Sequence, residues 1–347
     1  MSSGPNSTSP GSQIDQLSLG IIVIGISFVG FLSNGLATWF VATDPQFRHS
    51  TGIICINTTF ANFAYSTIYL CFVGPMMIMG LGWSNSEPMT SLSVIIWYLF
   101  FVGQYCAFCL SMNRAIAVLF PLSYYQHATV RLTIWLCSFI WIAAIGHLLF
   151  FILKICPGVQ FNAVQSYLAI SSWSDSAKRC VNFLRVNIEM YLLISLSTIS
   201  LLSDMSCAAR VLFSSTIRTK MKASDLQFLY QSLCASVFLC IECVLAGYVV
   251  ATATITNLTQ YFVLTTMNRV LGRAISGILV LVFHRKLRTR IVLTLFSICL
   301  SPDQQVTLVQ PLRPHPPAER ATKESNKSTD TNGSASPFPQ RLRSSPI

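Results

Sequence analysis

The feature that most constrains the fold of this chain is a series of seven long apolar segments. They span residues 18–42, 52–79, 89–119, 130–153, 186–213, 226–253 and 259–283. A helix needs about 20 apolar residues to cross the hydrocarbon core of a bilayer, and each segment reaches or passes that length. Inside lipid, only helices and closed barrels satisfy their own backbone hydrogen bonds. The sequence therefore predicts an all-α membrane protein, a seven-transmembrane helix bundle.

The charge content supports the same class of protein. Only 10% of the 347 residues are charged, whereas a soluble domain carries about 25%. A net charge of +11 in a soluble protein would suggest nucleic acid as a partner. Here the basic residues lie in short segments between the apolar ones, which is a topology signal instead. We expect no nucleic-acid partner.

The positions of the basic residues predict an N-terminus outside the cell. With that orientation, the gaps after the first, third, fifth and seventh segments face the cytoplasm, where Lys and Arg accumulate. The basic residues in or beside these gaps are Arg48, Arg131, Arg210, Arg218, Lys220, Lys222, Arg285, Lys286, Arg288 and Arg290. The long outer gap 154–185 also carries four, but a loop of that size is less constrained. A multi-pass protein of the plasma membrane is expected.

Four divisions of the chain follow from this topology. Residues 1–17 form a polar extracellular N-terminus with a glycosylation acceptor at Asn6. Residues 18–283 form the membrane domain. Residues 284–300 are predicted to be a basic amphipathic helix that lies on lipid at the inner face. Residues 301–347 are rich in Pro, Ser, Thr and Asn, so we expect a disordered cytoplasmic tail.

An Asn-Arg pair near the inner end of the third segment is the first functional signal. Asn113-Arg114-Ala115 is followed by Pro121-Leu122-Ser123-Tyr124, and charges inside a span are costly and tend to mark function. This pattern resembles the Asp-Arg-Tyr box and following loop of rhodopsin-like G-protein-coupled receptors. With Met112 in front of the pair, it is similar to the nematode serpentine chemoreceptors of class X.

Other segments extend the resemblance. Asn34 corresponds to the lone polar residue of the first receptor helix, and Trp141, 27 residues after Arg114, to the tryptophan of the fourth. Asn62 stands where many rhodopsin-like receptors carry a sodium-binding aspartate, and its amide has no charge to hold sodium. The class X likeness also covers Asp204 within Ser-Asp-Met and the stretch 228–232.

The sixth and seventh segments depart from the wider superfamily. Residues 239–244 read Leu-Cys-Ile-Glu-Cys-Val where that superfamily shows Cys-Trp-x-Pro. Residues 276–280 read Ser-Gly-Ile-Leu-Val in place of Asn-Pro-x-x-Tyr. These departures argue against a receptor of the amine, peptide or opsin type and fit class X.

The resemblance implies a rhodopsin-like chemosensory receptor for an extracellular small molecule, placed in a sensory neuron or its cilium. It also implies a heterotrimeric G protein as the inner partner and no cofactor. The coupling residues it predicts are Asn113, Arg114, Pro121, Arg218, Lys220 and Lys222. Two other classes stay open: a transporter or ligand-gated channel, against which no inverted repeat is found, and a non-signalling membrane protein.

Asn113 removes the acid that holds the box arginine in the wider superfamily. Asp225, at the inner start of the sixth segment, is a candidate to hold Arg114 as an inner latch. It is equally a candidate helix-start residue.

Three charges in the sixth and seventh segments lie deep in the membrane. At 1.5 Å per residue, Glu242 and Arg269 each lie about 15 Å below the outer ends of their segments. Equal depth and opposite charge predict a Glu242–Arg269 pair, with Arg273 turned toward Asn34 and Asn62. A structural role and a role in ligand binding or switching are both open for these residues, as they are for Asp204 in the fifth segment.

The cysteines predict one disulfide. Nine of the twelve lie in apolar segments, where a thiol behaves as a small apolar group. Cys156 and Cys180 lie in the long outer loop and face an oxidising compartment, so we expect them to pair. The sequence shows neither a metal-ligand cluster nor a hydrolase, protease or phosphate-loop motif, and an enzyme is not expected.

Overall fold

The computed structural model describes residues 10–79, 87–152, 159–162, 167–170, 191–214, 223–252, 262–284 and 288–293. Within these ranges, seven helices are long and apolar enough to cross a membrane. The prediction of a seven-helix membrane bundle is confirmed. Some predictions concern residues outside the described part, among them Asn6, Cys156, Cys180, Arg218, Lys220 and Lys222.

The helices follow the apolar segments closely. They are α1 (Pro10–Thr43), α2 (Ser50–Ile68), α3 (Gly74–Met79), α4 (Glu87–Leu119), α5 (Pro121–His127), α6 (Val130–Ile152), α8 (Leu193–Phe213), α10 (Ala223–Thr252) and α12 (Asn268–Phe283). A 3₁₀ turn, η1 (Pro45–Phe47), connects α1 to α2. The second span is α2 and α3 joined by a π turn, η2 (Tyr69–Val73), and the seventh contains a π turn, η5 (Val263–Met267), before α12.

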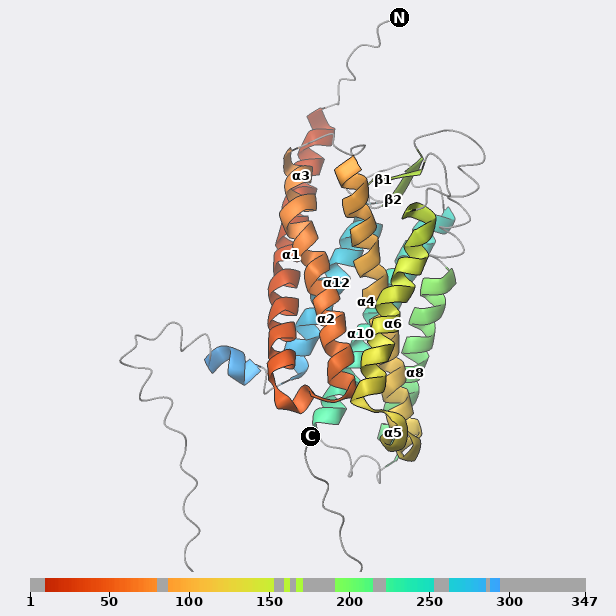
Figure 1. Cartoon of the computed structure of the whole chain (residues 1–347). Coiled ribbons are helices and arrows are strands. Elements are labelled where there is room, and N and C mark those ends of the chain that lie inside the picture. The colour runs from red at the N-terminus through yellow and green to blue at the C-terminus, as the bar shows by residue number, and fades with distance from the viewer. Residues whose placement is uncertain are drawn as a thin grey trace, which may run out of the picture. The chain divides into compact units, whose positions relative to one another are not determined.

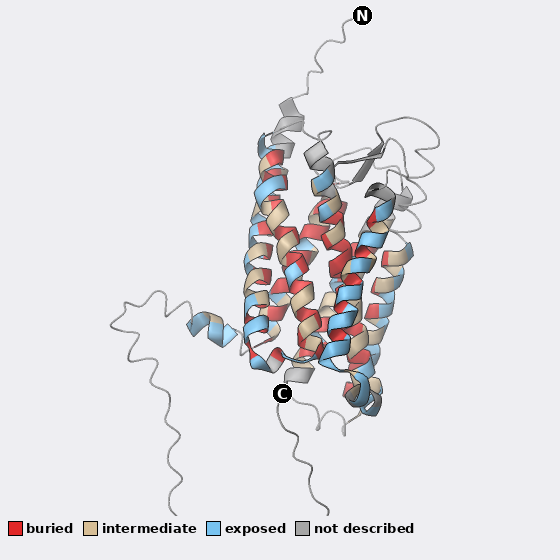
Figure 2. Cartoon of the chain, in the orientation of Figure 1, coloured by how far each residue is buried: buried red, intermediate tan, exposed pale blue. Residues whose placement is uncertain are grey.

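The spans pack in an order that places α4 near the centre of the bundle. α1 packs against α2 and α12, α2 against α4, α4 against α6 and α8, α8 against α10, and α10 against α12. Figure 1 shows the long helices side by side, with η1 and α5 at one end. We call this the inner end, following the predicted topology. Buried residues line the helix faces turned toward the bundle, and exposed ones face outward (Figure 2).

Local sequence explains where two helices meet at the inner end. Pro121 has no backbone N–H and cannot continue a helix, so α4 stops at Leu119. The same fixed φ favours proline in the first helical turn, and α5 begins there.

Several polar side chains inside the spans form hydrogen bonds within their own helix. Thr58 donates to the carbonyl of Ile54 at 2.9 Å, and Thr59 donates to that of Cys55 at 3.0 Å. No water competes for these carbonyls in lipid, so such bonds remove the cost of burying a hydroxyl.

A glycine allows α1 and α12 to approach closely. A Cβ on Gly277 would lie 2.6 Å from Oγ of Ser33 and 2.8 Å from the backbone N of Asn34. Across this contact, Nδ2 of Asn34 donates to the carbonyl of Gly30 at 2.8 Å and to that of Arg273 at 3.0 Å. Asn34 therefore joins the first span to the seventh, as expected of a lone polar residue in a span.

The outer loop contains a feature that the sequence reasoning did not include. Strands β1 (Val159–Asn162) and β2 (Tyr167–Ile170) pair antiparallel, with Val159 opposite Ile170 and Asn162 opposite Tyr167. Four-residue strands leave too short a pattern of alternation to predict. β1 lies against α4.

Candidate functional site

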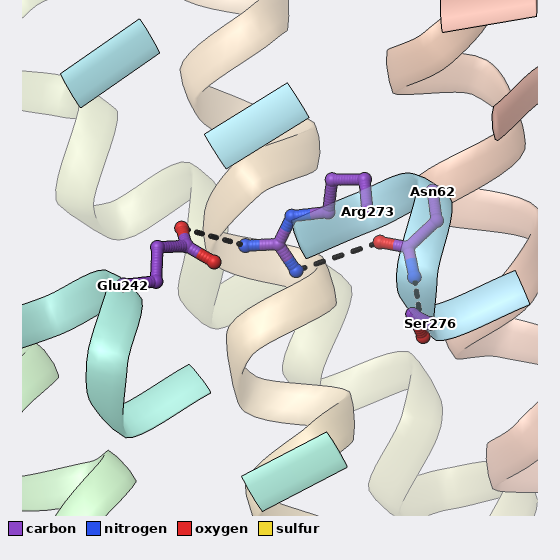
Figure 3. Close-up of polar contacts among 4 residues, drawn as sticks. All are labelled: Asn62, Glu242, Arg273 and Ser276. Atoms are coloured by element: carbon purple, nitrogen blue, oxygen red, sulfur yellow. Dashed lines mark hydrogen bonds and ion pairs between the residues drawn. The ribbon is translucent and has the colours of Figure 1, made fainter. Parts of the chain in front are cut away.

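A polar centre lies in the middle of the membrane, between α2, α10 and α12. Nη2 of Arg273 lies 3.7 Å from Oε1 of Glu242, and both side chains are buried. Nη1 of Arg273 donates to Oδ1 of Asn62 at 3.5 Å, and Nδ2 of Asn62 donates to Oγ of Ser276 at 3.1 Å. Figure 3 shows the guanidinium between the carboxylate and the amide. One cation thus connects the second, sixth and seventh spans.

The predicted Glu242–Arg269 pair is corrected by this geometry, because the ion pair of Glu242 is with Arg273. The depth count assumed a regular helix from the outer end. The π turn η5 holds an extra residue per turn, which shifts later residues by about 1.5 Å along the helix axis and by about 100° around it. Depth alone therefore does not decide which arginine faces Glu242. The expected turn of Arg273 toward Asn62 is present, and Asn34 contacts its backbone carbonyl.

Arg269 lies one turn farther out and packs on aromatic rings of α4. Its Cζ lies 4.6 Å from the ring centre of Trp97 and 4.8 Å from that of Phe100. Cation–π contacts of this kind contribute about 0.5–2 kcal/mol. Arg273 also lies over Phe100, at 4.9 Å, so both arginines share one aromatic wall.

A cavity extends from the polar centre toward the inner end. It holds about 730 Å³ of empty space, with its open side included, between α2, α4, α10 and α12. Glu242, Arg273 and Asn62 border it in the middle of the membrane, and Ser232 and Ser236 border it along α10.

The inner arginine site is built differently. Arg114 is 6% exposed, and Nε, Nη1 and Nη2 have no hydrogen-bond partner among the described residues. Its Cζ lies 5.4 Å from the ring centre of Phe228 in α10. A ring from another span, rather than a carboxylate, covers the cation.

Two further rings brace Phe228. The ring of His284, at the end of α12, lies 4.1 Å from that of Phe228, and Phe47 of η1 lies 5.6 Å from Phe228 and 5.4 Å from His284. Nε2 of His284 donates to Oε1 of Gln231 at 3.0 Å. Burial, with the positive charge of Arg114 adding to it, lowers the pKa of His284 to about 4. We call Phe47, Phe228 and His284 the aromatic cap.

Asp204 is a carboxylate in α8, which packs against the helix of Arg114, α4. Its side chain is fully buried. Its Oδ2 accepts hydrogen bonds from Ser232 at 2.9 Å and Ser236 at 2.6 Å, both in α10. Oδ1 has no hydrogen-bond partner within the part of the chain that is described.

Asn113 joins helices instead of holding Arg114. Its Oδ1 accepts from Ser50 at 3.0 Å, and its Nδ2 donates to Thr51 at 3.0 Å and to the hydroxyl of Tyr124 at 3.4 Å. The box asparagine therefore ties α4 to the start of α2 and to α5. Pro121, which is also predicted to take part in coupling, is exposed at the start of α5.

Two more predicted residues can be placed. Nε1 of Trp141 donates to Oδ1 of Asn57 at 3.0 Å and so joins α6 to α2. Asp225 lies in the first turn of α10, but its side chain is outside the described part of the structure, so the inner latch stays a prediction.

Comparison with known families decides the class of this protein. The family model described as "Serpentine type 7TM GPCR chemoreceptor Srx" matches residues 24–284. The chain belongs to the Srx family. Among its relatives is serpentine receptor class X 45 of Caenorhabditis elegans, 22% identical over 303 residues that cover 78% of this chain and 79% of the relative.

A second relative comes from vertebrates. Human N-formyl peptide receptor 2 is 31% identical over 129 residues, 37% of this chain and 36% of that receptor. This Srx protein is thus a receptor of the G-protein-coupled type and a multi-pass membrane protein, and its family is not a family of enzymes.

Sequence reasoning missed the aromatic cap and the serines that hold Asp204. Phe47 and Phe228 read as ordinary apolar residues, and His284 as the first residue of a basic segment. One signal was present: Phe228, Ser232 and Ser236 recur every four residues, which places them on one face of α10.

Proposed function

We propose that this Srx protein is a chemosensory receptor of the plasma membrane that detects an extracellular small molecule and signals through a heterotrimeric G protein. The observation that supports this most is the buried Arg114, whose nitrogens have no hydrogen-bond partner among the described residues. A buried charge without hydrogen-bond partners at the inner end of a span is costly. This energetic cost is expected where the side chain has a second conformation in which it finds a partner.

The proposed ligand contact is the outward part of the charged centre. Arg269 lies over Trp97 and Phe100 in the outer half of α4. Aromatic walls with a few polar groups are typical of small-molecule sites. Arg269 precedes Arg273 by four residues, so a molecule that moves Arg269 also acts on the Glu242–Arg273 pair through one helical turn.

Signalling then follows from a shift between two packings of the bundle. A ligand that binds one packing more tightly raises its population. In the proposed active packing, the inner end of α10 moves outward and takes Phe228 away from Arg114. Arg114 and the basic residues Arg218, Lys220 and Lys222 then meet the G protein.

The test is expression in cells that contain a promiscuous G protein and a calcium reporter, with a screen of volatile and water-soluble compounds. Arg114→Ala is expected to lose the response at unchanged surface expression. Arg210→Ala is the matched control, because Arg210 is an exposed arginine at the inner end of α8 that donates to the carbonyl of Leu119. It is expected to keep the response.

Three results would contradict the proposal. A compound-gated current without a G protein would indicate a channel. Compound uptake without a calcium signal would indicate a transporter. A response that survives Arg114→Ala would separate signalling from the inner arginine site.

A further inference from the structure

Two opposite charges near the inner end lie close to one another without pairing. Arg114 has three buried nitrogens, and Asp204 one buried oxygen, without hydrogen-bond partners among the residues described. They form no ion pair in this structure, although the contact between Ser111 and Ser200 joins their helices one turn away from both. In a low-dielectric interior, opposite charges attract strongly and an unpaired one is costly. Something must therefore keep them apart.

One face of α10 keeps them apart. Phe228, Ser232 and Ser236 are spaced by four residues and lie along one stripe of that helix. Phe228 covers the guanidinium of Arg114 at 5.4 Å. Ser232 and Ser236 donate to the same oxygen of Asp204 at 2.9 and 2.6 Å. One face of α10 thus contacts both the guanidinium of Arg114 and the carboxylate of Asp204.

The surroundings allow this face to leave. Ser232 and Ser236 border the cavity between α2, α4, α10 and α12, so the side of α10 that faces this cavity is not packed solidly at this level. Ser111 of α4 donates to the carbonyl of Ser200 in α8 at 2.9 Å. The helices that carry Arg114 and Asp204 are therefore joined to each other without α10.

We propose that Asp204 is the positioning residue that receives Arg114 when the receptor becomes active. Outward movement of the inner end of α10 removes Phe228 from the cation and both serines from the carboxylate in one step. The guanidinium and the carboxylate then form a charge-assisted pair that stabilises the active packing. This inference rests on the proposed function, since it takes Arg114 as the coupling residue.

The test is to release Asp204 from the two serines of α10 by mutation. Ser232→Ala/Ser236→Ala removes both donors that α10 supplies to the carboxylate, and a hydrogen bond to a charged group contributes more than a neutral one. Basal signalling is expected to rise about tenfold. Adding Asp204→Asn, which keeps the size and removes the charge, is expected to return it to the wild-type level. The matched control is Ser138→Ala/Ser206→Ala, two exposed serines bonded to their own helices.

A distance measurement gives a readout that needs no G protein. Arg131 and Tyr230 are both exposed near the inner end. Each is replaced by an unnatural amino acid that carries a spectroscopic label, and the pair of labels reports the distance between α6 and α10. The distance should widen in the Ser232/Ser236 variant and return with Asp204→Asn. If the distance responds in this way while no variant or compound gives a G-protein signal, the proposed function fails and the Arg114–Asp204 exchange stands.

Two outcomes would overturn the exchange. One is a Ser232/Ser236 variant with wild-type basal signal and wild-type distance. The other is an increase in basal signal and in distance that persists after Asp204→Asn is added, because the charge of Asp204 would then cause neither change. If the double variant is not expressed at the surface, Ser232→Ala alone is measured with the same criteria and a smaller expected rise.

Discussion

Two arginines are buried almost equally in this receptor, at 5% and 6% exposure for Arg273 and Arg114, and are held in opposite ways. Arg273 has a carboxylate at 3.7 Å and an amide at 3.5 Å. Arg114 has an aromatic ring at 5.4 Å. The buried carboxylate of Asp204 accepts hydrogen bonds from Ser232 and Ser236 instead of pairing with Arg114. Burial alone does not distinguish a fixed charge from a releasable one, whereas the chemistry of the partners does.

The difference also indicates where α10 would turn in the proposed active packing. Glu242 and Phe228 lie fourteen residues apart on this helix, which is about 21 Å along its axis. A tilt of α10 about the Glu242–Arg273 pair would leave the polar centre intact and displace the ring that covers Arg114. In this proposal the polar centre is the pivot, and Arg114 is the side chain that the tilt exposes.

The largest expected effect is at the polar centre. Glu242→Arg or Arg273→Glu places two like charges together, and breaking a buried pair typically costs 3–5 kcal/mol. Surface expression, measured by antibody on intact cells, should be lost in either single variant and partly recovered in the double exchange. Failure of the double exchange, together with recovery of Glu242→Arg by Arg269→Glu, would restore the pairing first predicted from the sequence.

The next effect is at the aromatic cap. Phe228→Leu keeps an apolar side chain and removes the ring, so Arg114 loses a contact worth about 1 kcal/mol. If that contact holds the inactive packing, basal signalling should rise about fivefold, with surface expression unchanged. Phe238→Leu is the control, because Phe238 lies on the same helix and is 42% exposed. Equal basal signals in the two variants would remove Phe228 from the account.

These two sites also show how far the sequence could be read. Apolar length and the placement of basic residues were enough for the seven spans, because lipid leaves the backbone so few alternatives. The Asn113-Arg114 motif located the inner site. The partner of Glu242 was missed because a depth count does not say which side of the helix each arginine faces, and the π turn that rotates them has no sequence signature. The aromatic cap was missed because rings that cover a cation look like core residues until η1, α10 and α12 are brought together.

A smaller effect should follow from crowding the polar centre. A Cβ on Gly103 would lie 2.9 Å from Nη1 of Arg273 and 3.1 Å from Oδ1 of Asn62. Both are ends of side chains that can shift, so we expect Gly103→Ala to cost about 1 kcal/mol, at the low end for overpacking. Gly146→Ala meets nothing within 4 Å and should gain slightly from helix propensity. Melting temperatures of the purified receptors would separate the two, and equal shifts would contradict close packing around Arg273.

The smallest effect near neutral pH comes from His284. Burial lowers its pKa to about 4, below the ordinary 6.5, so the unfolded chain takes up the proton first as pH falls. The stabilisation is complete above pH 6.5 and is lost as pH falls toward 4, by about 1 kcal/mol at pH 6. Thermal melting between pH 7.5 and 5.5 should show this slope in the wild type. A His284→Phe variant that keeps the same slope would show that another group causes it.

The central claim, that one buried arginine is held by an ion pair and the other by a removable aromatic cap, is tested most directly by one matched measurement. Arg273→Met and Arg114→Met are purified, and their melting temperatures are compared with the wild type. Arg273→Met leaves the carboxylate of Glu242 without its pair and should lose stability equivalent to about 3–5 kcal/mol. Arg114→Met removes a cation without hydrogen-bond partners in the described structure and puts a thioether against Phe228, so stability should stay within about 1 kcal/mol of wild type or rise. Equal losses in the two variants would contradict the account.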